Sequence, residues 1–218
     1  NLSHEYGYQG GTVYFDPPQQ YGDHILMNLW LRLLRCLVAA LFGRPLDPGQ
    51  GVSRLTFRVW PHDLDPSLHM NNGRYLTLMD LGRLDVLARS GLLRAAWRHG
   101  WTPIASGIQI RYRRELRLWQ TFRIETRLVG WQTHLVVMEQ RFVIETGPYA
   151  GQTAAIALFK GGLYDRAERR FIDVNRLMIE ANVKAESPNL TPDVVAFLAA
   201  DDAMRQVFGR GTQGVASG

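Results

Sequence analysis

One long amphipathic helix set among strand-like segments constrains the fold of this chain more than any other feature. Residues 73–90 carry apolar side chains at helical spacing, and Gly91 supplies a stop signal. Eighteen helical residues would span about 27 Å. A helix of this kind needs a sheet to cover its apolar face, and the sheet needs the helix. The alternating segments that would form this sheet are residues 52–60, 103–116, 121–131, 134–146 and 153–165.

One strand, one long helix and four further strands form an α+β order. With 218 residues, 46% of them hydrophobic, the chain can bury the core of one domain. The single cysteine, Cys36, cannot form an internal disulfide, so a cytoplasmic location is the default expectation. The formal net charge of +5 favours acidic partners, and leaves open a coenzyme A-like nucleotide, a nucleic acid or an anionic membrane surface.

Residues 25–43 form an apolar run that Arg32 and Arg35 interrupt. An arginine near the centre of a membrane-spanning helix costs about 2.5–3.5 kcal/mol, so we do not expect a span. Leucines at helical spacing predict an amphipathic helix in a membrane interface, with arginines reaching the phosphate head groups. Two alternatives stay open: a helix packed on its own domain or a partner subunit, and a signal segment. The leucines are Leu26, Leu29, Leu33 and Leu37.

The ends of the chain carry weaker signals. Residues 1–24 lack periodicity, and Met27 is a candidate natural start, which makes this segment a disordered arm, a cloning remnant or an upstream read-through. Thr191 as N-cap and Pro192 at the first position predict a C-terminal helix. We therefore expect a helix over 25–43, a linker over 44–51, the main domain over 52–183, a helical extension over 184–208 and a disordered tail over 209–218.

The stretch "DLDPSLHMNN", residues 63–72, places unusual polarity directly before the long helix. Helix N-capping would account for Asn71 or Asn72, and leaves Asp63, Asp65 and His69 to explain. A helix N-terminus binds anions through its free N–H groups, and a carboxylate just ahead of it can face the same point. This arrangement suits acyl transfer, because the N–H groups hold an oxyanion while the carboxylate attacks or activates water.

The longer stretch "DLDPSLHMNNGRYLTLMD" resembles the motif of hotdog-fold acyl-CoA thioesterases of the 4-hydroxybenzoyl-CoA thioesterase type. Within that superfamily the sequence is similar to the thioesterase superfamily member six group, over about residues 52–165. The resemblance implies a long central helix wrapped by a five-stranded antiparallel sheet, here with N-terminal and C-terminal helical extensions. Two positions depart from the pattern: Leu68 replaces a glycine, and residues 118–121 replace a Gly-Asp turn.

The resemblance also implies roles for individual residues. Asp65 would be the nucleophile or general base, and the backbone N–H near Asn72 would polarise the thioester carbonyl; the rival interpretation makes Asp65 a turn aspartate. Asp63 is expected to be structural, through bonds to nearby backbone. Arg111 and Arg113 are candidates for coenzyme A phosphates, although alternation also fits the solvated face of a strand. The remaining candidate substrate-binding residues are His69, Asn71, Tyr75 and Asp80, the last also as a second candidate carboxylate.

These features predict an acyl-CoA thioesterase that releases free acid and coenzyme A without metal or cofactor. The alternative is a non-catalytic acyl-binding or membrane-associated hotdog protein. A hydratase is disfavoured, because Asp65 and His69 are four positions apart where a spacing of five is expected. The six histidines are scattered, so we expect no metal site, and no nucleic-acid partner. Exposed strand edges predict a homodimer with sites at the subunit junction, and a tetramer is compatible with the resemblance.

Overall fold

An antiparallel sheet forms the body of the computed structural model, which describes residues 22–184 and 186–211. Its strands run in the order β1, β3, β4, β5, β2, so that β1 and β2 are the two edges. The predicted α+β class and the five antiparallel strands are confirmed, and a two-residue strand pairs with β5 in addition. The strands are β1 (Ser53–Arg58), β2 (Trp101–Tyr112), β3 (Thr121–Gln132), β4 (Leu135–Ile144), β5 (Thr153–Asp165) and β6 (Arg170–Phe171).

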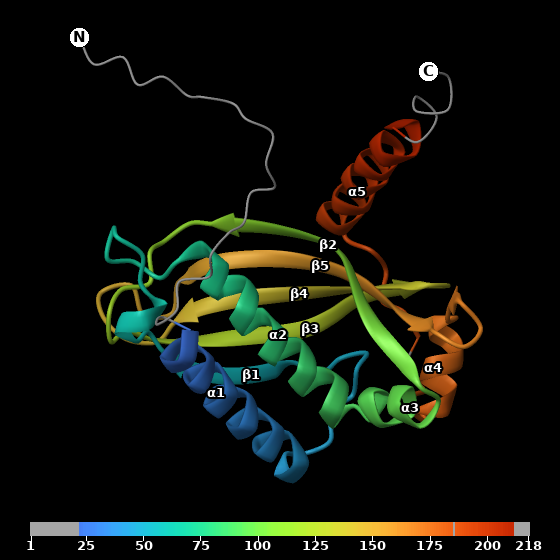
Figure 1. Cartoon of the computed structure of the whole chain (residues 1–218), viewed down its shortest axis with the longest axis horizontal. Helices are drawn as coiled ribbons and strands as arrows, with labels where there is room; N and C mark the ends of the chain where they lie inside the picture. The colour runs from blue at the N-terminus through green and yellow to red at the C-terminus, as the bar shows by residue number, and fades with distance from the viewer. Residues whose placement is uncertain (1–21, 185, 212–218) are drawn as a thin grey trace, which may run out of the picture.

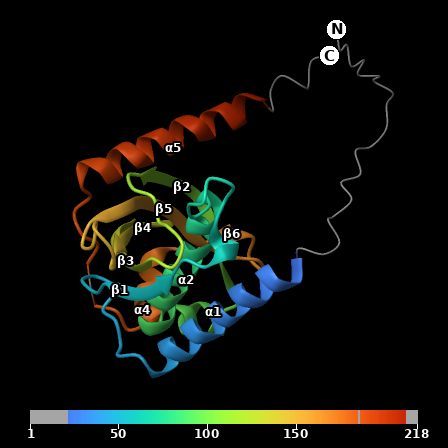
Figure 2. The ribbon, with the colours of Figure 1, turned by 90° about the vertical axis from the view of Figure 1, so that its left-hand side faces the viewer.

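Helix α2 (Asn72–Arg89) lies across one face of this sheet, which curls around it (Figures 1 and 2). Its start and end fall within one residue of the prediction. The buried residues recur at helical spacing, and at Gly82 the helix approaches the sheet closely. A Cβ atom there would lie 2.4 Å from Thr126 Oγ1 and 3.0 Å from Gln140 Nε2. Glycine is therefore required for this packing distance.

Helix α1 (Gly22–Phe42) packs alongside α2 (Figure 1). It begins three residues before the expected start. Leu33, from the predicted apolar stripe, packs against the core, while Leu34 and Val38 on another face are exposed. The expectation that Arg32 reaches lipid head groups is wrong, because its side chain is buried inside the protein. Residues 22–24, expected to belong to a disordered arm, are part of α1. The rest of that expected arm, residues 1–21, lies outside the described residues.

Two short helices that the sequence patterns did not predict flank the C-terminal end of α2. They are α3 (Leu92–Arg98) and α4 (Val174–Glu180), and both bury apolar side chains in one cluster with that end of the sheet. The expected linker is held to α2, because the N–H of Leu46 donates to the carbonyl of Arg89 at 3.1 Å. Helices α2, α3 and α4, together with the connection between α1 and β1, thus close this end of the molecule.

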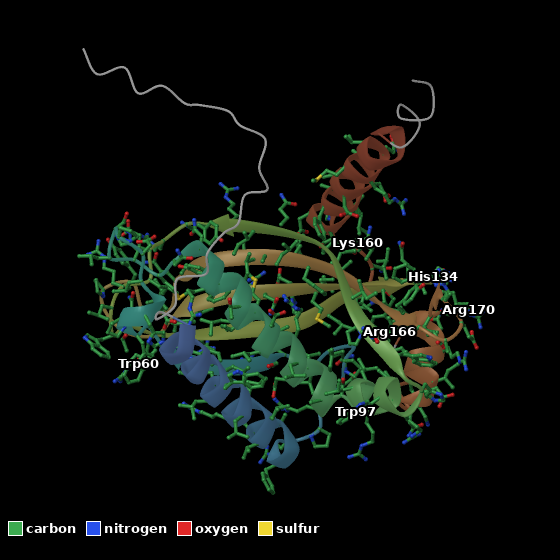
Figure 3. All side chains as sticks on the ribbon, in the orientation of Figure 1. Trp60, Trp97, His134, Lys160, Arg166 and Arg170 are labelled. Carbon is green, nitrogen blue, oxygen red and sulfur yellow. The ribbon has the colours of Figure 1, made fainter. Side chains whose placement is uncertain are left out.

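Helix α5 (Pro192–Gly211) lies on the sheet face opposite α2 (Figure 2). Val194 and Phe197 pack against β4 and β5. Lys160, labelled in Figure 3, forms an ion pair with Asp201 in the middle of the helix. The predicted start at Pro192 is confirmed, and the helix continues to Gly211, into the segment expected to be disordered.

We predict that Gly82→Ala destabilises the protein by about 1–3 kcal/mol, because the added methyl group overpacks the helix–sheet contact. Alanine's higher helix propensity would act in the opposite direction by only about 1 kcal/mol. Chemical denaturation measures the difference, and exposed Arg94→Ala on α3 serves as a control, with an expected change within about 0.5 kcal/mol. A more stable Gly82→Ala variant would contradict the close approach.

Candidate functional site

The polar loop before α2 is folded back on itself. A short 3-10 helix over Pro61–Asp63 opens it. Leu64 then pairs with Met70 as an isolated antiparallel bridge, and His69 pairs in the same way with Arg117 of the β2–β3 connection. Trp60, at the start of the loop, lies at the end of the molecule where α2 begins (Figures 1 and 3). Backbone pairing on both sides therefore places the loop beside the N-terminus of α2.

Asp63 is a buried anchor of this loop. Its carboxylate accepts hydrogen bonds from Arg32 of α1 at 2.7 and 3.2 Å and from Arg74 of α2 at 2.9 and 3.0 Å. The backbone N–H of Trp60 donates to the same carboxylate at 3.0 Å. Burial alone would raise the pKa of Asp63, but these donors outweigh burial and hold the pKa below its usual value. The expected structural role of Asp63 agrees with this geometry.

Asp65 is half-buried and closes the turn that follows it. Its Oδ1 accepts the N–H of Ser67 at 2.9 Å and that of His69 at 3.4 Å. Its own N–H donates to the carbonyl of His69 at 2.9 Å. These bonds fit the turn interpretation, and they also fix the carboxylate in one orientation. They use Oδ1, so a turn role and a chemical role for Oδ2 are compatible.

The first turn of α2 is capped by Asn71, whose side chain accepts the N–H of Gly73 at 2.8 Å. Arg74 donates its N–H to the carbonyl of Asn71. Among residues 22–184 and 186–211, no group accepts a hydrogen bond from the Asn72 N–H. Tyr112 of β2 donates its hydroxyl to the Asn72 carbonyl at 3.3 Å and so ties the helix start to the sheet edge. The Asn72 N–H is therefore a candidate oxyanion donor.

These groups border one open surface depression of about 390 Å³. Asp65, His69, Asn72 and Tyr75 line it from the loop and α2, and Arg113 lines it from the end of β2. Asn71 caps the helix next to it, and Tyr112, Arg114 and Glu115 complete its rim. The structure thus brings most of the predicted site residues together.

The ring of Tyr75 is buried at the floor of this depression. It contacts the Tyr112 ring edge to face, with 5.0 Å between centroids. Burial raises the pKa of the Tyr75 hydroxyl, which keeps it protonated and able to donate. On the rim, Nε2 of His69 lies 3.0 Å from Glu115, which also accepts from Arg117 at 3.1 Å.

Two predicted residues lie elsewhere. Asp80 is exposed two turns further along α2 and pairs with Arg83, and it lines a different cavity. Arg111 is exposed on β2, which matches the alternative that it belongs to the solvated face of a strand. Arg113 belongs to the depression, but Arg111 is not among the residues that line it.

A wider groove of about 700 Å³ adjoins the depression through the shared residues Arg113, Arg114 and Glu115. The guanidinium of Arg114 lies 4.1 Å from the centre of the Tyr149 ring and donates to Gln152 at 2.7 Å. Trp119 lines the same groove and contacts Trp60 edge to face. Cationic and aromatic side chains together suit a ligand that carries phosphates and a planar base.

Sequence reasoning missed two participants, Glu115 on the rim and Arg32 beneath the loop. Glu115 sits in an arginine-rich run and carries no spacing signal. Arg32 is 31 positions from its partner Asp63, and only the burial of an arginine in an apolar helix could have suggested the pair. Within the described part of the chain, no three histidine, cysteine, aspartate or glutamate side chains converge as a metal site would need.

We predict that Arg32→Met lowers the free energy of unfolding by roughly 3 kcal/mol, because it leaves part of a buried carboxylate charge unpaired. The folded-state pKa of Asp63 is depressed, so its contribution is present above about pH 4 and is lost as the pH falls through the folded pKa. The stability difference between pH 7 and pH 3 should therefore shrink in the variant. Denaturant titrations at both pH values measure it.

Arg35→Met is the matched control for this experiment, because Arg35 is exposed on the same helix. We expect it to change stability by less than about 0.5 kcal/mol. Equal losses in the two variants, or an unchanged pH dependence in Arg32→Met, would show that the buried ion pair does not stabilise the loop.

Known proteins show where this chain belongs. The model of the thioesterase-like superfamily matches residues 59–198. Protein THEM6 of Xenopus laevis is 35% identical over 148 residues, which are 68% of each chain, and protein THEM6 of Danio rerio is 37% identical over 55% of this chain and 57% of its own. The crystal structure of YbaW, a probable thioesterase from Escherichia coli, is 26% identical and superposes with a TM-score of 0.54 over 60% of this chain and 98% of YbaW. The predicted resemblance is confirmed, and the chain belongs to the thioesterase-like superfamily as a hotdog-fold relative of the THEM6 proteins.

Proposed function

We propose that this protein is an acyl-CoA thioesterase that uses Asp65 and the N–H of Asn72. Membership of the superfamily supports thioester hydrolysis as the general chemistry. The observation that carries the specific proposal is the shared depression, which a carboxylate oriented by its turn and an N–H group at a helix start both line. A thioester carbonyl placed there would meet the carboxylate on one side and the helix N-terminus on the other.

In the proposed reaction, the Asp65 carboxylate either attacks the thioester carbon or removes a proton from a water molecule that attacks it. The carbonyl oxygen gains negative charge and accepts a hydrogen bond from the Asn72 N–H. The C–S bond then breaks, and coenzyme A leaves as a thiolate that takes up a proton. Water supplies the new oxygen of the acid in both routes, directly or by hydrolysing the acyl-Asp65 anhydride.

The adjoining groove supports coenzyme A as the thiol part of the substrate. Arg113 borders both hollows, and Arg117 stands on the groove wall. Exposed arginines bind phosphates through two parallel hydrogen bonds. Trp119 and Tyr149 offer ring faces for an adenine. These features favour a nucleotide-bearing thioester over a small one.

We further propose that the working unit is a homodimer joined along β2. This strand is a sheet edge, and most of its residues from Ala105 onward are exposed. A partner strand would pair its free backbone groups. Because Tyr112 of β2 lines the depression, the partner would also wall in the site and shield it from bulk solvent.

Asp65→Asn should lower turnover at least about 100-fold, because the amide can neither attack nor take up a proton. The turn should persist, since an amide oxygen can accept the same N–H groups. Release of coenzyme A from short, long and aromatic acyl-CoAs measures the rate, and a thermal melt measures the fold.

Asp47→Asn is the matched control, because Asp47 also accepts an N–H two residues on, from Gly49 at 2.8 Å, but lies in the linker. We expect it to retain the wild-type rate. A normal rate in Asp65→Asn would remove this carboxylate from the mechanism, and no turnover by the wild type on the whole panel would refute the thioesterase proposal.

A second candidate function, membrane association, is favoured by the outer face of α1. Within the described residues no helix is long and apolar enough to cross a membrane. Trp30, Phe42 and three of the large apolar residues between them are nevertheless exposed, and the exposed Arg35 accompanies them. An exposed apolar face with cationic side chains is suited to lie in an anionic membrane interface. The exposed apolar residues are Trp30, Leu31, Leu34, Val38 and Phe42.

For this candidate we expect the double variant Leu31→Gln, Leu34→Gln to bind vesicles of phosphatidylcholine and phosphatidylserine at least about tenfold more weakly than wild type, because it lacks two exposed leucines that the membrane would bury. Flotation of the vesicles measures the bound fraction. The double variant Met204→Gln, Val207→Gln removes equally exposed apolar residues from α5 and serves as the control. Equal flotation of all three proteins would refute membrane contact through α1.

A further inference from the structure

An apolar cavity between the C-terminal half of α2 and the sheet takes no part in the site described above. It has a volume of about 290 Å³, close to the lower end of the range for small-molecule pockets, roughly 300–1,000 Å³. Helices α3 and α4 and strands β2, β3, β4 and β5 complete its walls. Apart from Asp80 and Arg83, every residue that lines it is apolar or glycine.

Arg83 is held rigidly at this cavity. Its Nη1 donates to Gln140 Oε1 at 2.8 Å, and its guanidinium lies 4.2 Å from the centre of the Phe159 ring. Gln140 is itself buried and anchored, since its amide donates to the Met79 carbonyl and to Thr126. The arginine side chain is only 13% exposed. A buried arginine that meets a neutral amide and a ring leaves much of its charge uncompensated on that side.

The paired carboxylate does not cancel this charge inside the cavity. Asp80 bonds to Arg83, but its side chain is 70% exposed, so water screens it. Hydrogen bonds to Gln140 and Asp80 use two of the five guanidinium N–H groups. The cavity therefore offers an apolar body and, on one wall, a fixed cation with N–H groups to spare.

We propose that this cavity binds an apolar chain that ends in a carboxylate, with the carboxylate on Arg83 and the chain against the leucines of α2, α3 and α4. A cation beside an apolar wall selects such a ligand over a plain hydrocarbon or an alcohol. Two sources supply this chemistry: a free fatty acid, and the far carboxylate of a dicarboxylic acyl thioester.

Within one subunit the cavity is separate from the Asp65 depression. Positions 72 and 83 on α2 are about 16 Å apart along the helix axis. The fully buried side chains of Leu78 and Met79 lie between them. The cavity is thus a second binding site on the same helix, and a thioester held in the depression of the same subunit does not reach it. The dicarboxylic source therefore needs the depression of the other subunit in the proposed homodimer, whose joining strand β2 lines the cavity. Only the dicarboxylic source rests on the proposed thioesterase function.

Calorimetric titration of decanoate and 1-decanol tests the proposal directly. We expect wild type to bind decanoate at least tenfold more tightly than decanol. In Arg83→Met this preference should vanish, while decanol binding stays the same. Equal binding of the two ligands by wild type, no decanoate binding, or a preference that survives in Arg83→Met would overturn the proposal.

Two further variants secure the interpretation. Leu87→Trp fills the cavity from α2 and should abolish binding of both ligands. Arg94→Met removes an exposed arginine from α3 and should change neither. If Arg83→Met does not fold, the proposal is tested by two results: the preference of wild type for decanoate over decanol, and the loss of decanoate binding in Leu87→Trp. Decanoate binding that survives in Leu87→Trp would place the ligand elsewhere and overturn the assignment.

The two sources are separated by turnover of sebacoyl-CoA and decanoyl-CoA. A higher kcat/KM for sebacoyl-CoA that depends on Arg83 would identify the far carboxylate of a thioester. Equal values, with Arg83-dependent decanoate binding, would identify the free acid. Decanoate binding without any turnover would refute the thioesterase function and leave this binding site standing. Turnover without Arg83-dependent decanoate binding would support the thioesterase function and overturn this binding site.

Discussion

The rest of the structure depends on one buried carboxylate. The Asp63 carboxylate accepts hydrogen bonds from Arg32 of α1, from Arg74 of α2 and from a backbone N–H of its own loop. Three segments of the chain therefore meet at a single charge. Its carbonyl also accepts the N–H of Asn71, the residue that caps α2. The position of the loop relative to the helix N-terminus is therefore fixed from beneath. Asp65 and the Asn72 N–H line one depression because of this arrangement.

The elements with strong local signals were predictable. Apolar periodicity located α2, the Asn71–Asn72 pair located its cap to within one residue, and alternation located the strands, because each of these signals is contained in a short stretch of chain. The site loop was predictable for the same reason. Helices α3 and α4 were missed, since each has seven residues and is stabilised by packing in a shared cluster rather than by its own pattern.

The parts of the site that could not be predicted are long-range. The pairing of Arg32 with Asp63 spans 31 positions, and the position of Glu115 next to His69 comes from the pairing of the loop with the β2–β3 connection. Asp80 is the acidic residue that the motif predicts at this position, yet it lines the cavity between α2 and the sheet and not the Asp65 depression. A motif identifies residue types at their spacing, whereas the direction of each side chain is decided by how the helix is rotated on the sheet.

The two departures from the family motif have a backbone consequence. Leu68 and Trp119 both have φ of 62°, the left-handed region that favours glycine. Such a conformation costs about 1–2 kcal/mol for other residues. Contact between the Trp119 and Trp60 rings offsets part of this cost. Both residues lie in the loops around the depression, so the chain holds strain beside its candidate site and gains an exposed leucine and tryptophan there.

The Arg32–Asp63 pair also limits how this chain can evolve. Removal of either partner leaves a desolvated charge, while replacement of both by apolar groups of similar size need cost little. The two positions are therefore epistatic: a lineage that loses the N-terminal helix must change the acid at position 63 as well, or retain an unfavourable intermediate. The pair thus makes α1 an energetically inseparable part of the hotdog domain.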